Sequence, residues 1–286
     1  MRARTLGAAL LLTALVAACA EPRPPVPLPI PRPSAYASPA PDGPPRRGWD
    51  VVHTVEVPDG WTRGDQQVDR SHESTVWRPV SREDVLCGTG VWAPGALDQE
   101  PSGGQDVVVQ GRPGLFFPDE PGPDESLDGL WWRYRRDAWA SLSCTGLGAA
   151  DHLAMADRVR FRPTRYPMPY RLRSMPPGYR VSYLSTRTEA GATTYVLALE
   201  NLGEDEFPMA PDISLGPPPP TPDPRSLCLP QGPQALCVGG GLDSNPPEPD
   251  GDARLRARLQ AVADVLEVAP DLADRGTWFG GDDVPG

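Results

Sequence analysis

The segment LWWRYRRDAWASLSC, residues Leu130–Cys144, sets the expected architecture of this protein. Two stretches rich in aromatic and apolar residues, Leu130–Tyr134 and Trp139–Cys144, flank the polar tip Arg135-Arg136-Asp137. Two such stretches separated by a short polar tip are typical of a β-hairpin. The sequence therefore predicts an antiparallel sheet in this part of the chain.

Elements before and after this hairpin extend the pattern. Strands followed by one helix occur twice, which predicts the fold class α+β, with two small units that each consist of an antiparallel sheet covered by a helix. The expected elements are a hairpin over Asp106–Phe117, a short amphipathic helix over Ala149–Val159, strands over Arg180–Leu184 and Tyr195–Glu200, and a longer helix over Asp252–Val268.

A weak internal repeat supports the division into two units. Val57–Trp61 aligns with Met175–Tyr179, 118 residues further on, and Val107–Phe117 aligns with Cys228–Val238. The identities are few, so a chance match is the alternative interpretation. The expected units are residues 49–164 and 165–286.

The N-terminus predicts export from the cytoplasm. Arg2 and Arg4 precede the apolar stretch Leu6–Ala18, which is too short to span a bilayer as a mature helix. Residues 1–18 therefore have the pattern of a signal peptide.

The end of this stretch, Val16-Ala17-Ala18-Cys19, resembles the lipobox of bacterial lipoproteins. The resemblance implies that Cys19 is acylated, and two or three acyl chains of the palmitate type, at about 0.8 kcal/mol per buried methylene, anchor a protein stably. The expected location is the outer side of the cell membrane, and the alternative is a plain secretory signal with a chance cysteine. All 27 basic residues are Arg, which is typical of a GC-rich genome such as that of an actinobacterium.

Residues 19–48 are rich in proline, which nearly alternates from Pro22 to Pro33. Such a composition favours polyproline II, a semi-rigid spacer of about 3.1 Å per residue. We interpret this stretch as a linker between the lipid anchor and the folded part. A proline-rich motif for a partner protein is the alternative.

Four of the five cysteines remain after Cys19, an even number that predicts two disulfides in an oxidising compartment. Three connectivities can be drawn. Cys228 and Cys237 flank a short turn segment and can face each other across a hairpin, which leaves Cys87 to pair with Cys144. Free buried thiols are the alternative, and the absence of a C-x-x-C spacing disfavours metal and redox roles.

The formal net charge of −11 argues against nucleic acid as a partner. Against this background, no acidic residue separates Arg158 from Arg180, a stretch that is rich in Arg and Tyr. The guanidinium group of Arg binds phosphate through two parallel N–H groups, so this run is a candidate patch for anionic headgroups, wall polymers or an acidic protein. The alternative is that these arginines are solvated residues of strands. Trp131, Trp132 and Trp139 are open to the same two interpretations, a groove for glycan or lipid, or core. The candidate anion-binding residues are Arg160, Arg162, Arg171 and Arg173.

None of the three histidines, His53, His72 and His152, lies in a known catalytic or metal-binding motif. Acidic pairs such as Asp282-Asp283 lack the spacing of a calcium loop. The sequence therefore predicts a non-enzymatic protein without metal or cofactor, and an envelope hydrolase is the alternative.

Residues 105–163 resemble the lipoprotein-carrier-like domains of bacterial surface lipoproteins and anti-sigma regulators. The resemblance follows the order of an apolar strand with a Gly turn, a Trp-rich hairpin, and an Ala-rich helix with Ala156-Asp157. It implies a curved sheet and a helix whose apolar interior holds a lipid tail.

Taken together, these features predict a lipid-anchored envelope protein that acts as a binding or assembly component. The expected ligand is amphiphilic or anionic, and the alternative is a subunit that binds an envelope protein.

Overall fold

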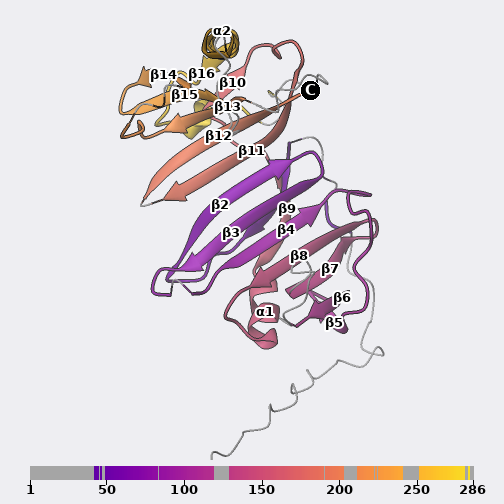
Figure 1. Cartoon of the computed structure of the whole chain (residues 1–286). Helices are drawn as coiled ribbons and strands as arrows, with labels where there is room; N and C mark the ends of the chain where they lie inside the picture. Colours follow the sequence, from indigo (N-terminus) through magenta and orange to yellow (C-terminus); the bar gives the residue numbers. More distant parts are fainter. Residues whose placement is uncertain are drawn as a thin grey trace, which may run out of the picture.

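The computed structural model describes residues 42–44, 46, 49–82, 84–118, 129–189, 191–202, 211–221, 223, 225–240, 251–280 and 283. Its main feature is a twelve-stranded antiparallel sheet that runs the length of the molecule (Figure 1). In spatial order its strands are β14 (Ser226–Gln231), β15 (Gln234–Gly240), β13 (Pro211–Gly216), β12 (Ala192–Asn201), β11 (Tyr179–Glu189), β2 (Trp61–Asp69), β3 (His72–Pro79), β4 (Cys87–Trp92), β8 (Ala138–Cys144), β7 (Gly129–Arg135), β6 (Arg112–Phe117) and β5 (Gln105–Val109).

Strand β3 shows why these segments form a sheet. Its residues Glu73, Thr75 and Trp77 are buried, and the residues between them are half-buried. Successive side chains of a strand point to opposite faces, so this alternation covers one face with core and leaves the other nearer to solvent.

The prediction of an α+β fold with a separate sheet in each unit is wrong, because the protein is mostly β and the strands expected in the two units join in one sheet. The junction is the pairing of β2 with β11, in which Val68 lies opposite Leu184 and Gln66 opposite Thr186. Unpaired edge strands would expose rows of N–H and C=O groups, and this pairing satisfies both edges at once. Sequence patterns of single strands do not show which edges meet.

The two segments that align in sequence at the start of each half have the same local geometry. Gly60 and Gly178 both have a positive φ, of 76° and 80°. In each case the aromatic residue that follows, Trp61 or Tyr179, donates its N–H to a proline carbonyl three residues earlier. These turns lead into β2 and β11, the sixth and fifth of the twelve strands, which pair with each other near the middle of the sheet.

The second pair of aligned segments forms the hairpins at the two ends of the sheet, β5–β6 and β14–β15. Both turns contain Gln-Gly, and Gly111 and Gly232 have positive φ angles of 73° and 62°. Counted outward from the β2–β11 junction, however, β15 and β14 are fourth and fifth, the places that β8 and β7 take in the other half, whereas β6 and β5 are sixth and seventh. The alignment of these two segments therefore does not match the order of the strands.

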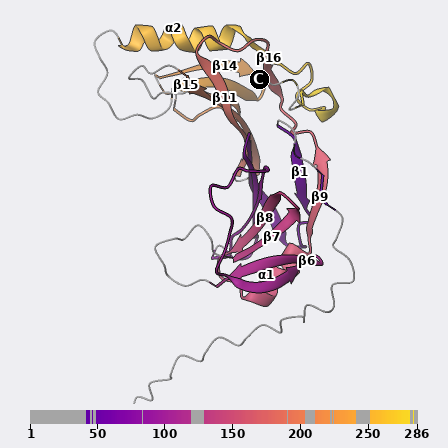
Figure 2. The ribbon, with the colours of Figure 1, turned by 90° about the vertical axis from the view of Figure 1, so that its right-hand side faces the viewer.

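Buried side chains form two clusters. One includes Trp77, Trp132 and Tyr134 beneath β3–β8 and the helix α1 (Ala149–Ala156). The other includes Tyr166, Tyr170 and residues of the helix α2 (Gly251–Asp264). Figure 2 shows α1 and α2 at opposite ends of the molecule.

Both helices are shorter at their C-terminal ends than the sequence predicts. After α1, Val159 begins β9 (Val159–Thr164), which pairs with β1 (Val51–Val55) in a separate two-stranded ribbon. After α2, β16 (Leu266–Val268) pairs with β10 (Tyr170–Leu172). In both cases the apolar residues that would continue the buried face of the helix pair instead with a strand far away in the sequence. This tertiary pairing outweighs the local preference for helix.

The structure contains two disulfides, Cys87–Cys144 and Cys228–Cys237, the pairing that the spacing favours. Cys87 and Cys144 face each other on β4 and β8, and Cys228 faces Cys237 across the β14–β15 hairpin. Each bond therefore links strands that already pair.

The expected signal peptide, Cys19 and most of the Pro-rich linker lie outside the described residues. Among the helices that the structure describes, none is long and apolar enough to cross a membrane.

Candidate functional site

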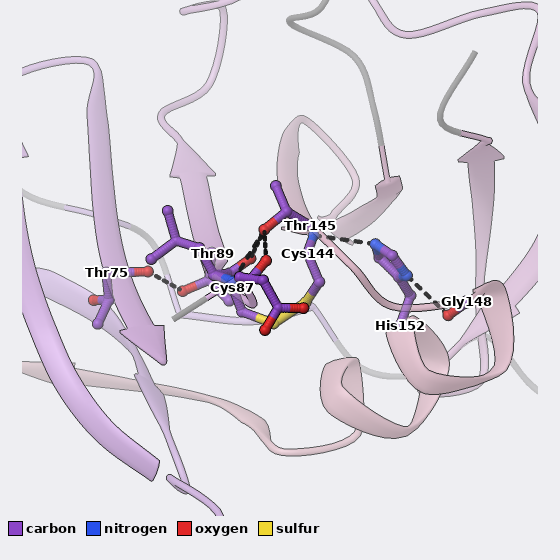
Figure 3. Close-up of a disulfide and its surroundings, with 9 residues drawn as sticks. Thr75, Cys87, Thr89, Cys144, Thr145, Gly148 and His152 are labelled. Atoms are coloured by element: carbon purple, nitrogen blue, oxygen red, sulfur yellow. Dashed lines mark hydrogen bonds between the residues drawn. A yellow bond between two sulfur atoms is a disulfide. The ribbon is translucent and has the colours of Figure 1, made fainter. Parts of the chain in front are cut away.

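His152 connects α1 to the disulfide of β4 and β8 (Figure 3). Its Nε2 accepts the N–H of Cys144 at 3.1 Å, and its Nδ1 lies 3.0 Å from the carbonyl oxygen of Gly148. A carbonyl can only accept, so Nδ1 carries the proton and Nε2 is the acceptor. With both nitrogens engaged and the residue 3 % exposed, His152 has a structural role.

A second histidine lies in a network that the sequence did not indicate. His53 Nδ1 bonds the Glu73 carboxylate, and His53 Nε2 lies 3.0 Å from Thr89 Oγ1. A hydroxyl, an imidazole and a carboxylate in a row are also the components of a nucleophilic triad. Here His53 and Glu73 are 0 % exposed and Thr89 is 2 % exposed, so a substrate has no access to the hydroxyl.

This network holds the β1–β9 ribbon against the main sheet. At a bulge in β1, the backbone N–H groups of Val52 and His53 both donate to the Glu73 carboxylate, at 2.9–3.0 Å. Arg46 forms an ion pair with the same carboxylate, with Nε 3.6 Å from Oε2. The available sequence signal was a glutamate that alternates with Thr75 and Trp77 along β3 and so shares their inward-facing side.

His72 lies on the opposite face of the sheet. Its ring is 4.5 Å from that of Trp92, which in turn is 4.6 Å from Trp131. Burial lowers the pKa of His72 below its usual range. A Cβ at Gly90 would come within 3 Å of both the Trp92 and His72 side chains, so these rings lie directly over the backbone of β4.

The structure does not bring the four predicted anion-binding arginines together. Arg160 and Arg162 lie on β9, whereas Arg171 and Arg173 lie on and just after β10. Several of their guanidinium groups already have partners. Arg160 makes a two-point ion pair with Glu56 at 2.9 and 3.0 Å.

The arginines near β10 are engaged as well. Arg171 pairs with Glu267 at 2.9 Å and stacks on the ring of Phe279 at 4.5 Å. Arg173 donates to the Asp264 carbonyl at the end of α2. Binding of an anion at these residues would compete with existing contacts.

The most promising site is an open pocket of about 540 Å³ between residues 42–44, the β5–β6 hairpin, the end of α1 and β9. We call it the Phe161 pocket. The Phe161 ring stacks on Tyr134, with centroids 4.8 Å apart and an interplanar angle of 13°. Around this aromatic ring stand groups of both charges, Asp42, Arg112, Asp157 and Arg160.

One wall of the Phe161 pocket depends on Gln110. It has a φ of 53°, an unusual value for a residue other than glycine. Its side-chain amide donates to the carbonyls of Ala156 and Val159, at 2.7 Å each. These bonds tie the β5–β6 turn to the end of α1 and to β9, and so fix the shape of the pocket.

The interior that the carrier-like resemblance assigns to a lipid tail is occupied by the protein's own side chains, including the fully buried Trp77, Trp132 and Leu142. Trp131 and Trp139 are 5 % and 9 % exposed, so they too are packed. Within the described ranges, no group of three or more His, Cys, Asp or Glu side chains could hold a metal ion.

Comparisons with known proteins leave the family open. No protein-family model matches the chain, and no curated protein matches it. A crystal structure of MucB in complex with MucA(peri) matches 73 % of this chain and 93 % of its own, with 12 % identity and a TM-score of 0.22. A match of that quality carries no argument about the fold or function of this protein.

Proposed function

We propose that this protein is a lipid-anchored binding component of the cell envelope, without enzymatic activity, and that the Phe161 pocket holds a segment of a partner protein. The two disulfides support a location outside the cytoplasm, where such bonds persist. The lipobox-like end of residues 1–19 supports the anchor.

The observation that carries the assignment of a protein ligand is the mixture of groups around the pocket. Asp42 and Asp157 stand beside Arg112 and Arg160, over the Phe161 ring. Two carboxylates would repel a phosphate-rich ligand, whereas a polypeptide offers apolar, cationic and anionic groups together. Arg160 is also neutralised by Glu56, which removes much of its attraction for a free anion.

Photo-crosslinking in cells tests this proposal. A photoreactive p-benzoylphenylalanine at Asp157, an exposed residue of the pocket, should capture one segment of one envelope protein, identified by mass spectrometry. The same group at Leu229, which is 39 % exposed on β14, is the control and should not capture it. Phe161→Leu keeps an apolar side chain but removes the stacking ring, so it should reduce capture.

Two results would contradict the assignment. Capture of the same protein from both positions would mean that the pocket is not the binding site. An adduct of lipid or glycan mass at Asp157 would favour the alternative, an anionic or amphiphilic ligand. In that case replacement of Arg160, Arg162, Arg171 and Arg173 by Ser should abolish retention on anionic liposomes at low salt.

A further inference from the structure

A short segment before β1 lies against the β7–β8 hairpin in the manner of a bound peptide. We call residues 42–44 and 46 the strap. The N–H of Gly43 donates to the carbonyl of Tyr134 at 2.9 Å, and the carbonyl of Gly43 accepts from Arg135 Nη1 at 2.9 Å. The first of these is a main-chain bond of the kind by which sheets bind extended peptides, and the second comes from a side chain.

An irregularity in the β7–β8 hairpin explains why the Tyr134 carbonyl can accept a hydrogen bond from the strap. The pairing of β7 with β8 shifts between Arg133 and Arg135, so the ladder skips Tyr134. The Tyr134 carbonyl therefore accepts from donors outside the ladder, the N–H of Gly43 and the Nη1 of Arg112. At the tip of the hairpin, the N–H of Arg136 donates to Asp42 Oδ1 at 3.1 Å.

Two positions of the strap are selective. A Cβ at Gly43 would lie 2.7 Å from a ring atom of Tyr134 and 3.0 Å from its carbonyl oxygen, so only glycine fits. Three residues later, the Arg46 side chain is 1 % exposed, donates to the carbonyl of Asp69 and faces Glu73. The site therefore recognises a glycine followed by an arginine at the third position after it.

The contacts of Arg46 are incomplete, which favours exchange over permanent attachment. Its Nε and Nη1 are buried without a hydrogen-bond partner. Desolvation of a guanidinium offsets much of the Coulomb gain from a buried carboxylate. The desolvation cost of Arg46 therefore offsets part of the free energy that the hydrogen bonds of Gly43 contribute to attachment of the strap.

We infer that the groove along Tyr134, Arg135 and Glu73 is an exchangeable peptide site, and that the strap of a second copy of this chain can occupy it in place of the chain's own. A second copy carries the same glycine and arginine at the same spacing. Exchange of an identical segment between copies is a low-cost route to a dimer. The strap residues Asp42, Gly43 and Pro44 also line the Phe161 pocket, and the strap of a second copy would supply the same residues there. The proposal does not rest on what occupies that pocket.

The first test uses full-length chain purified in detergent and a synthetic peptide with the sequence of residues 40–48. Gly43→Val should expel the chain's own strap, so this variant should bind the peptide. The wild-type chain should bind it at least about tenfold more weakly, because its own strap competes at a roughly millimolar effective concentration. Peptides with Gly43→Val or Arg46→Leu are the matched controls and should not bind.

The second test is complementation between two variants. A chain with a defective strap, Gly43→Val, and a chain with a weakened site, Arg135→Ala, which lacks the donor to the Gly43 carbonyl, should form a mixed dimer when combined. Gly43→Val alone should stay monomeric in analytical ultracentrifugation. Peptide binding without a mixed dimer would overturn the assignment of a second copy.

Circular dichroism separates failure to bind from failure to fold. Absence of peptide binding to folded Gly43→Val, and to Arg46→Leu as a second strap variant, would overturn the exchangeable site. If both variants lose their fold, the strap is an integral part of the structure, and the proposal is equally wrong.

Discussion

Replacement of Glu73 by Gln removes the negative charge that holds the β1–β9 ribbon and Arg46. The carboxylate accepts from the backbone N–H groups of Val52 and His53 and from the His53 ring. A Gln amide keeps one acceptor oxygen but turns the other position into an NH₂ donor. That donor would face the N–H of Val52 or the guanidinium of Arg46, and the buried Arg46 would lose its counter-ion.

The loss of one member of a buried ion pair costs about 3–5 kcal/mol, because the other charge stays buried without compensation. We therefore expect Glu73→Gln to lower the free energy of unfolding by about that amount. Urea unfolding followed by tryptophan fluorescence measures the effect. With a slope of roughly 1–3 kcal/mol per molar urea, the midpoint should fall by at least about 1 M.

The control is the same substitution at Glu56, which makes a two-point ion pair with Arg160 but is 59 % exposed. Ion pairs on the surface contribute about 0–1 kcal/mol, so Glu56→Gln should leave the midpoint almost unchanged. If Glu73→Gln lowered the midpoint no more than Glu56→Gln, the buried network would not be what secures the ribbon, and the argument from burial would fail.

Two further predictions concern the disulfides and the buried tyrosine. Cys87 and Cys144 are 57 residues apart and Cys228 and Cys237 are 9 apart, so chain entropy predicts that replacing the first pair by Ala costs roughly 4 kcal/mol and the second roughly 3 kcal/mol; equal melting temperatures of the two double variants would contradict this order. Burial raises the pKa of Tyr134 from 10.0 to about 12. Since the folded state holds this proton more tightly, the stability from Tyr134 is complete below pH 10 and is lost as the pH rises towards 12. Tyr134→Phe should therefore lose less stability than the wild type between pH 10 and 12, and parallel pH profiles would show that Tyr134 does not titrate in this range.

Among the site residues, the local environment of His152 shows what a sequence pattern can and cannot predict. The sequence places it near the start of the helix expected over Ala149–Val159 and outside any known catalytic motif. Its acceptor bond to Cys144 depends on where α1 lies on the sheet, which no local pattern encodes. The same holds for His53, whose partner Glu73 is 20 residues away in the chain.

The sequence by itself determined the strands that alternate in hydrophobicity, the Gly turns and the hairpin across Cys228 and Cys237, because a turn and a period of two are local properties. Only the tertiary structure decided that β2 and β11 join in one sheet, that Arg160 and Arg171 are neutralised by distant carboxylates, and that the strap lies on β7. Each of these features joins a strand edge or a charged side chain to a residue that is far away in the sequence. The choice among such partners depends on which surfaces meet when the whole chain packs.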